Sequence, residues 1–170
     1  MSDPSSGAPG RSASPPGTGR RPIRVLVVCT GNSARSILAE ALLRTHGDDD
    51  FEVHSAGTEP RGINPYTARV LDEAGIDDSW ARSKSVEEFL GQSFDYVITV
   101  CDQARQVCPV FPGVHRRLHW GYEDPAAVEG SEDERLAAFR TTLTLMASRI
   151  QAFITLARRE RDEAATSPRA

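Results

Sequence analysis

The sequence predicts an α/β fold in which a four-stranded parallel sheet is flanked by helices on both faces. Short, largely apolar stretches such as Val25–Val28 and Phe94–Val100 are typical of parallel strands buried on both faces. Segments with apolar residues at helical spacing separate the strands, and right-handed crossovers then place helices on both sides. With 170 residues and 39% hydrophobic content, the chain can bury one sizeable core, so we expect one domain.

The expected domain organisation follows from composition. Residues 1–20 are rich in Ser, Pro and Gly and have no apolar periodicity, so burial there does not offset the entropy of ordering, and we expect a disordered tail. A single α/β domain is expected over 21–160, and residues 161–170 are expected to fray as a C-terminal tail.

Charge and cysteine content exclude several classes of protein. The net charge is −4 and no basic block is present, which argues against nucleic acid or an anionic membrane as the main partner. No apolar run reaches the length of a membrane span and no signal peptide is recognisable, so we expect a cytoplasmic protein. Three cysteines fit reactive thiols better than a disulfide framework.

The first half of the domain is predicted to contain two strands and two helices. The first strand, Ile23–Val28, leads into a polar loop, and the helix after the loop is expected to end at His46-Gly47. Phe51–Ser55 alternate as a second strand. Asn64-Pro65 has the N-cap and first-turn residues of a helix that is expected to reach Ala74 before Gly75 stops it.

The second half is predicted to supply the remaining strands and a long helix. A brief strand is expected around Trp80–Arg82, then a helical turn over Val86–Leu90. Phe94–Val100 and His115–Leu118 are predicted to be the last two strands of the sheet. Ser131 and Glu134 form a capping box for a final helix, whose apolar stripe comprises Leu136, Phe139, Leu143, Met146, Ile150 and Ile154.

The loop between the first strand and the first helix is a candidate oxyanion site. Its residues are small or polar and let backbone N–H groups turn inward, next to the positive end of a helix dipole: Thr30, Gly31, Asn32, Ser33, Ala34, Arg35 and Ser36. Thiolate is favoured in such a place, so Cys29 is a candidate nucleophile, and the Arg35 fork can hold two oxygens of a tetrahedral anion. Ser36 can donate a hydrogen bond to the thiolate. A lone cysteine at a strand end is more often a small buried hydrophobe, but this one is followed by Arg35 and Ser36 at a specific spacing.

Three further residues carry chemistry. Pro125 favours an extended or turn conformation at Asp124, so we expect its carboxyl group over the mouth of the crevice, where it can protonate a leaving oxygen; most Asp-Pro pairs are plain turns. Cys101 directly follows a predicted strand, and at parallel strand ends it should face the same crevice as Cys29. Cys108 lies seven residues later, on the same face of a predicted helix and about 10 Å away at 1.5 Å per residue.

A disulfide requires α-carbons within roughly 7 Å, so Cys101 and Cys108 can join only if the segment between them unwinds. Polar residues fill that segment and Pro109 ends it, which suits a piece of low local stability. The alternative is two unrelated buried cysteines.

The loop Cys29-Thr-Gly-Asn-Ser-Ala-Arg-Ser36 resembles the phosphate-binding loop of the low-molecular-weight protein tyrosine phosphatase superfamily, and most of all that of its thioredoxin-coupled arsenate reductases. The resemblance extends over about Ile23–Ala157 and implies the fold of that superfamily. Tyrosine phosphatases of this kind usually carry an aromatic residue after the Asp-Pro pair, whereas Ala126 is similar to the reductases. The reductases also carry two cysteines at the place of Cys101 and Cys108.

The resemblance implies an arsenate reductase with a relay of three thiols. Cys29 would attack arsenate held by the loop and Arg35, while Asp124 protonates the departing hydroxide. Cys101 would then attack Cys29 and release arsenite, and Cys108 would form a Cys101–Cys108 disulfide that thioredoxin reduces. We expect an arsenate or phosphate oxyanion and thioredoxin as partners, and neither a metal ion nor another cofactor.

Two departures from the family concern the loop and its support. Ala34 stands where some members have a further cysteine, and its loss leaves the three-thiol relay intact. Some members bind potassium through Asn, Glu, Ser and Asp, and the first three match Asn32, Glu40 and Ser55. Lys84, the only lysine in the chain, stands at the fourth place, where its ammonium group would repel the ion.

Two other functions remain open at this stage. A low-molecular-weight phosphatase acting on phosphotyrosine or small phosphomonoesters would use the same Cys29, Arg35 and Asp124 without the other thiols. A non-catalytic oxyanion sensor is the third possibility, although it would require neither a general acid nor two extra cysteines.

Overall fold

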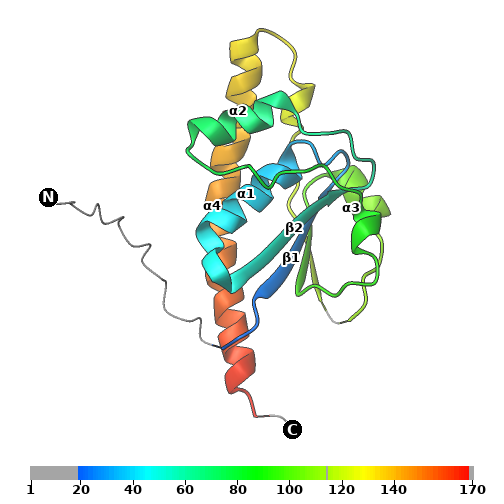
Figure 1. Ribbon diagram of the computed structural model, residues 1–170, viewed down its shortest axis with the longest axis vertical. Coiled ribbons are helices and arrows are strands. Elements are labelled where there is room, and N and C mark those ends of the chain that lie inside the picture. The colour runs from blue at the N-terminus through cyan, green and yellow to red at the C-terminus, as the bar shows by residue number, and fades with distance from the viewer. Residues whose placement is uncertain (1–18, 114, 169–170) are drawn as a thin grey trace, which may run out of the picture.

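A four-stranded parallel sheet forms the centre of the computed structural model, which describes residues 19–113 and 115–168 (Figure 1). Its strands lie in the order β2-β1-β3-β4, with bounds Ile23–Cys29 (β1), Phe51–Gly57 (β2), Tyr96–Thr99 (β3) and Arg116–His119 (β4). All pairings are parallel. The predicted fold class and the four principal strands are confirmed.

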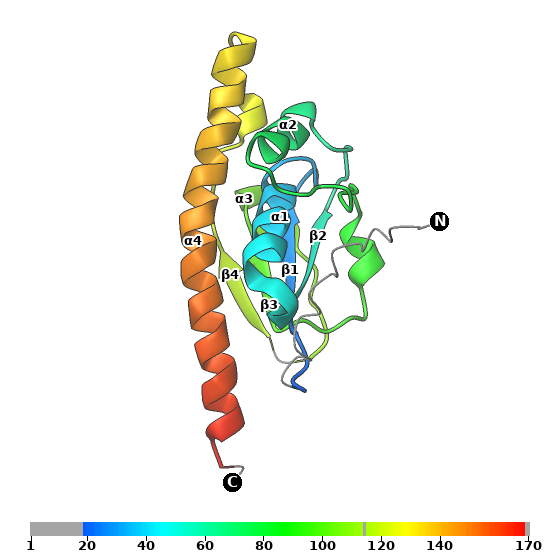
Figure 2. The same cartoon turned by 60° about the vertical axis from the view of Figure 1, so that its left-hand side comes forward.

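Helices cover both faces of this sheet. The α-helices are α1 (Arg35–Gly47), α2 (Pro65–Glu73), α3 (Asp102–Val107) and α4 (Glu132–Thr166), and the 3-10 turns are η1 (Asp48–Asp50), η2 (Val86–Phe89) and η3 (Pro125–Ala127). The helices α1 and α4 lie on one side of the sheet and α3 lies on the other (Figure 1). The longest helix, α4, runs the full length of the molecule beside α1 (Figure 2). None of the helices in the described residues is both long and apolar enough to cross a membrane.

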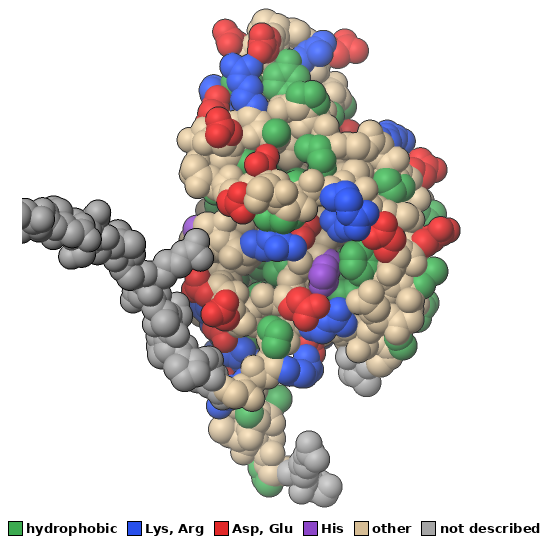
Figure 3. Space-filling model, viewed as in Figure 1, with side chains coloured by type: hydrophobic (Ala, Val, Ile, Leu, Met, Phe, Trp, Pro, Cys, Tyr) green, Lys and Arg blue, Asp and Glu red, His purple; other side chains and the backbone are tan. Residues whose placement is uncertain are grey.

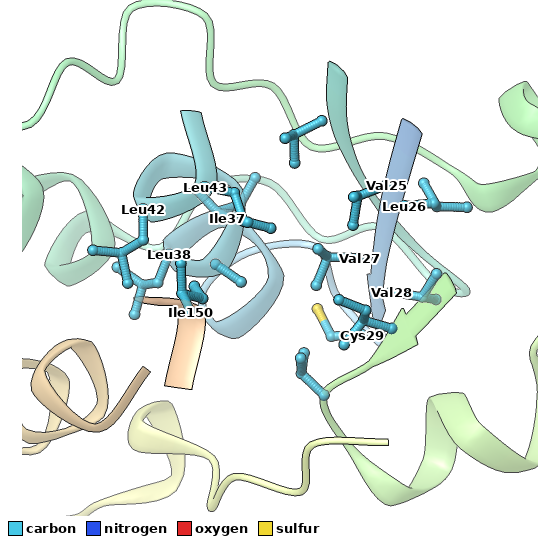
Figure 4. Packing of buried hydrophobic residues seen from close by; sticks show 14 of the residues in the cluster. Val25, Leu26, Val27, Val28, Cys29, Ile37, Leu38, Leu42, Leu43 and Ile150 are labelled. Carbon is cyan, nitrogen blue, oxygen red and sulfur yellow. The ribbon is translucent and has the colours of Figure 1, made fainter. Parts of the chain in front are cut away.

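The core lies between the sheet, α1 and α4. Val25–Val28 of β1 are fully buried, because β1 has a strand on each side and helices above and below it. Val25 and Val27 point toward Ile37, Leu38 and Leu43 of α1, and Ile150 of α4 joins this cluster, whereas Leu26 and Val28 point to the opposite face of the sheet (Figure 4). Burial of each such side chain contributes about 1.5–3 kcal/mol. This well-packed layer fixes the end of β1, where Cys29 lies.

The caps predicted for two helices are present. The Asn64 side chain accepts a hydrogen bond from the Tyr66 N–H at 2.9 Å, and Pro65 is the first residue of α2. The Ser131 hydroxyl accepts one from the Glu134 N–H at 3.1 Å at the start of α4. Both helices therefore begin where the sequence predicts.

The predicted strand over Trp80–Arg82 is wrong. A turn lies at Ser79–Trp80, where the Ala81 N–H binds the Asp78 carbonyl at 2.8 Å and the Trp80 indole N–H binds the Asp77 carbonyl at 2.9 Å, and Ala81 and Arg82 form no regular element. Pairing with a strand occurs only farther along, at an isolated parallel bridge between Ser85 and Gly57, where the Lys84 carbonyl accepts from the Gly57 N–H at 2.7 Å.

The C-terminal helix extends beyond the expected end of the domain at residue 160, as far as Thr166. Arg161 of this last stretch donates to the Asp50 carboxylate at 2.9 Å, next to Arg158, which donates to the same carboxylate at 2.8 Å. Of the expected N-terminal tail, residues 1–18 lie outside the described residues. On the face shown in Figure 3, acidic and basic side chains are interspersed.

Candidate active site

The loop between β1 and α1 surrounds the Cys29 thiol with hydrogen-bond partners. Cys29 is 3% exposed, its Sγ lies 2.8 Å from Ser36 Oγ, and the Asn32 N–H donates to it at 3.2 Å. Asn32 adopts a φ of 44°, in the left-handed region that Asn tolerates better than most residues. This turn brings the backbone of the loop back over the sulfur, so that the Asn32 N–H points at it.

The segment after β2 orients the loop through its carbonyl groups. N–H groups of Thr58, Glu59, Arg61 and Asn64 donate to the carbonyls of Cys29, Thr30, Gly31 and Ser33, at 2.8–3.1 Å. The carbonyls are thus turned away from the cleft. In the described part of the chain the N–H groups of Gly31 and Ser33 form no hydrogen bond, so they are available to an anion.

Gly57, at the end of β2, allows the segment after β2 to approach the loop after β1. Sequence reasoning did not identify this role. A Cβ at this position would lie 2.6 Å from the Thr30 carbonyl oxygen and 2.9 Å from the Asn32 nitrogen. Any side chain would therefore push the loop away from β2. The signal in the sequence is a glycine at the end of a strand, which often marks close backbone approach.

Arg35 and Asp124 face each other across the cleft. Arg35 Nη1 donates to the Tyr122 carbonyl at 3.0 Å, and its Nη2 lies 3.7 Å from Asp124 Oδ2. Asp124 caps η3 by accepting the Ala126 N–H at 3.0 Å, and its side chain is 44% exposed. The carboxyl group is therefore held at the mouth, next to the guanidinium that would bind the anion.

These groups line a cleft of about 440 Å³ together with the Arg61–Pro65 segment, Gln103 and Ala126. The small Ala126 leaves the wall beside Asp124 open. A larger hollow, about 600 Å³, lies at the opposite ends of the strands beside Ile23 and Tyr96. Neither the thiols nor residues 30–36, which we call the anion loop, line it. The smaller cleft is the one with the groups for oxyanion chemistry.

Cys101 lies against the start of the anion loop. Its Sγ is 3.3 Å from Thr30 Oγ1, and Thr30 directly follows Cys29. The strand register explains the proximity, because Val28 of β1 pairs with Thr99 of β3, and Cys101 comes two residues after Thr99. All three cysteines are free thiols.

Cys108 lies at the far end of α3, and here the predicted geometry is corrected. Cys101 and Cys108 are the capping residues on either side of α3 and do not share a helix face. Pro109 disfavours helical backbone at the residue before it, and Cys108 has φ −62° and ψ 125°. Burial raises the pKa of the half-buried Cys108 thiol, and the nearby Arg117 partly offsets this.

The four residues expected to support the loop are brought together behind it. Asn32 Nδ2 donates to Ser36 Oγ at 2.8 Å and to Ser55 Oγ at 3.0 Å, while its Oδ1 accepts from the Lys84 N–H at 2.8 Å. Ser55 in turn donates to Glu40. Lys84 Nζ lies 3.8 Å from Glu40 Oε2 and donates to the Arg82 carbonyl at 2.8 Å. Burial lowers the pKa of Lys84.

Arg44 is a member of this cluster that sequence reasoning missed. Its Nε and Nη2 donate to Glu40 Oε1 at 3.0 and 2.9 Å, and its guanidinium lies 4.4 Å from the centre of the Trp80 ring. Glu40 and Arg44 are four residues apart on α1, a spacing at which helical side chains meet. The four-residue spacing of Glu40 and Arg44 was therefore the signal in the sequence that the two side chains form an ion pair.

Comparison with known proteins gives consistent matches. The family model for low molecular weight phosphotyrosine protein phosphatase matches residues 24–163. The arsenate reductase of Halalkalibacterium halodurans is 40% identical over 129 residues, which cover 76% of this chain and 93% of that protein. The arsenate reductase of Bacillus subtilis is 36% identical over the same lengths.

Solved structures similar to this one are also arsenate reductases and a phosphatase. An arsenate reductase in the phosphate binding state has a TM-score of 0.63 at 28% identity, covering 78% of this chain and 97% of that one. A thioredoxin-dependent arsenate reductase of Corynebacterium glutamicum has a TM-score of 0.57 at 31% identity, covering 79% of this chain and 65% of that one. The YwlE arginine phosphatase of Geobacillus stearothermophilus, at 22% identity, shares the fold with a TM-score of 0.64, covering 88% of this chain and 100% of that one.

Proposed function

Because this chain belongs to the low molecular weight phosphotyrosine protein phosphatase family, we propose that it is an arsenate reductase whose electrons come from thioredoxin. The observation that carries the proposal is the contact of Cys101 with the anion loop, 3.3 Å from Thr30 Oγ1, with Cys108 at the other end of a short helix. A phosphatase needs neither thiol. The similarity to arsenate reductases at 36–40% identity supports the same function.

The first step is nucleophilic attack by Cys29 on arsenic(V). The N–H groups of the loop and the Arg35 guanidinium would hold the arsenate oxygens, and Ser36 and the Asn32 N–H stabilise the attacking thiolate. Asp124 would donate its proton to the departing hydroxide, which leaves as water. The product is a Cys29–arsenic(V) bond, with no change yet in oxidation state.

Reduction occurs in the second step. The Cys101 sulfur attacks Cys29 Sγ, the sulfur–arsenic bond breaks, and its electron pair stays on arsenic, which leaves as arsenite. Cys108 then attacks Cys101, so that Cys29 leaves as a thiolate and a Cys101–Cys108 disulfide remains. The thioredoxin dithiol reduces this disulfide and restores both thiols. Such a relay requires a reducing compartment, so the proposal places the reaction in the cytoplasm.

A phosphatase is the second candidate function, because the complete Cys29, Arg35 and Asp124 set lines one cleft. The same first step on a phosphomonoester would give a phosphocysteine that water hydrolyses. Ala126 leaves no aromatic wall beside Asp124 for a phosphotyrosine ring to stack on. We therefore propose phosphatase action as a weak side activity.

One assay tests the function and the electron donor together. Purified protein is incubated with arsenate, thioredoxin, thioredoxin reductase and NADPH, and the oxidation of NADPH is followed. The parallel assay replaces the thioredoxin system with glutathione, glutaredoxin and glutathione reductase. We expect arsenate-dependent oxidation of NADPH with thioredoxin. Hydrolysis of p-nitrophenyl phosphate without any arsenate-dependent NADPH oxidation would overturn the reductase in favour of the phosphatase.

A further inference from the structure

A series of side-chain contacts joins the start of α3 to the ends of two strands. His119, the last residue of β4, has its Nε2 2.9 Å from Asp102 Oδ1 at the start of α3. Its Nδ1 lies 2.8 Å from Oγ1 of Thr99, the last residue of β3. A neutral imidazole with its proton on Nε2 serves both contacts, because it donates to the carboxylate and accepts from the Thr99 hydroxyl.

Two of the three residues, Thr99 and Asp102, flank Cys101 in the sequence. Thr99 precedes Cys101 by two residues, and Asp102 follows it directly. Gly121 lies beside the contact, where a Cβ would come 3.4 Å from His119 Nε2 and 4.0 Å from Asp102 Oδ1. Residue 121 is therefore in van der Waals range of both partners of this contact.

The two ends of the Thr99–His119–Asp102 series of contacts differ in burial, so one end is fixed and the other can move. Thr99 is buried and the His119 side chain is 20% exposed, so the ring is fixed from the side of the sheet. The Asp102 side chain is 87% exposed and is free to move away. The sheet therefore holds the imidazole, and the imidazole holds the first turn of α3.

Among the described residues, few other contacts stabilise α3, one of them the Thr30 hydroxyl, which donates to Gln103 Oε1 at 3.5 Å. The helix has six residues, of which Ala104 alone is buried, so few apolar contacts oppose its opening. Under the proposed function this helix must unwind, because the capping residues Cys101 and Cys108 are about 10 Å apart along it at 1.5 Å per residue, and a disulfide needs less than roughly 7 Å. The His119–Asp102 contact must then break.

We propose that His119 is a positioning residue of the thiol relay, which keeps α3 wound and Cys101 beside Thr30 by holding Asp102. This inference rests on the proposed function. The contact stabilises the dithiol form of Cys101 and Cys108 and not their disulfide. It therefore makes the disulfide easier for a dithiol reductant to reduce, and it opposes premature joining of the two thiols.

The test measures the Cys101–Cys108 equilibrium in the full chain carrying Cys29→Ser, which removes the competing thiol. The protein is equilibrated in mixtures of reduced and oxidised glutathione. Two protein thiols then lose two protons and two electrons to oxidised glutathione, which yields two molecules of reduced glutathione. Free thiols are trapped with a maleimide and counted by mass spectrometry, and peptide mapping identifies the disulfide.

Replacing His119 should favour the disulfide. We expect His119→Leu to raise the disulfide-to-dithiol equilibrium constant about three- to tenfold, since a single hydrogen bond to an exposed carboxylate is of modest strength. A tenfold change corresponds to about 30 mV. His115→Leu is the matched control, because the one side-chain hydrogen bond of His115 among the described residues is to the Gly113 carbonyl, and the equilibrium constant of this variant should equal that of the reference.

A double-mutant cycle separates positioning from general packing. In a chain that already carries Asp102→Ala, adding His119→Leu should change the equilibrium constant no further. A persistent effect of His119→Leu in that background, or no effect in the reference, would overturn the inference. If His119→Leu does not fold, Thr99→Val is used in its place, and it should shift the equilibrium in the same direction because it releases the ring. Failure of the reference itself to form a Cys101–Cys108 disulfide would instead overturn the relay in the proposed function.

Discussion

Arg44 is the principal charge partner of Glu40, with two hydrogen bonds of 3.0 and 2.9 Å to Oε1, whereas the Lys84 ammonium is 3.8 Å from Oε2. Glu40 is 1% exposed and would be costly to leave as an unpaired anion. Through Ser55 and Asn32 it supports the anion loop. The bracing of the loop thus depends on a second cation that the sequence analysis did not assign.

Replacement of Arg44 should therefore destabilise the protein more than replacement of Lys84. We expect Arg44→Met to lower the free energy of unfolding by about 1–3 kcal/mol and Lys84→Met by less. Urea denaturation measures both. Arg159→Met is the control, because Arg159 forms a similar pair with Glu163, 2.7 Å apart and four residues along a helix, but exposed, so its loss should cost less than about 0.5 kcal/mol. Equal effects of Arg44→Met and Arg159→Met would contradict the assignment.

The proposed relay divides the work among the thiols. Cys29→Ser should abolish arsenate reduction and hydrolysis of p-nitrophenyl phosphate, because both begin with the same nucleophile. Cys108→Ser should stop arsenate turnover after one cycle and leave the hydrolysis unchanged. Circular dichroism verifies the fold of each variant. Loss of hydrolysis in a folded Cys108→Ser variant would refute this division.

Asp124 is expected to donate the proton to the leaving group. Asp124→Asn keeps the shape and the acceptor for the Ala126 N–H but has no acidic proton, so kcat should fall about 10²- to 10⁴-fold. The free energy of unfolding should change little, because the side chain is largely exposed. Steady-state kinetics at neutral pH tests this, and an unchanged kcat would exclude Asp124 as the acid.

Lys84 should make a potassium ion unnecessary. Its ammonium lies in the cluster with Glu40, Ser55 and Asn32, so the wild type should have the same Tm in potassium chloride and sodium chloride at equal ionic strength. Lys84→Asp adds a carboxylate in place of the ammonium, and its Tm should be higher in potassium chloride. Lys84→Met, with neither charge, is the control and should show no preference. A potassium-specific rise of Tm in the wild type would refute the idea.

Tyr96 should make the protein less stable at alkaline pH. Burial, and the Glu160 carboxylate 2.5 Å from the hydroxyl, raise the pKa of Tyr96 well above its ordinary value of 10. Above pH 10 the unfolded chain loses the tyrosine proton while the folded chain keeps it, so stability falls as pH rises, by up to about 1.4 kcal/mol per pH unit. Tyr96→Phe should lack this loss, and the stability difference between the two proteins should shrink from pH 9 to pH 11. A difference independent of pH would contradict the raised pKa.

Features that depend on neighbours in the chain could be predicted from the sequence. The strand before Cys29, the polar loop, and the caps at Asn64 and Ser131 are set by residues within one turn of one another. The apolar stripe of α4 follows from helical periodicity in the same way. Even the proximity of Cys101 to the loop could be expected, because parallel strands end at a common edge of the sheet.

Contacts between distant segments were decided only by the tertiary structure. The turn at Trp80 places its ring under Arg44, and Gly57 lets β2 approach the anion loop. The His119–Asp102 contact joins residues seventeen positions apart. A local pattern specifies that a side chain is polar or small, whereas its partner depends on how strands and helices pack, which no local pattern contains. The sequence by itself therefore identified the proposed nucleophile and determined the frame of the loop, and the packing of the chain decided which residues hold that loop and α3 in place.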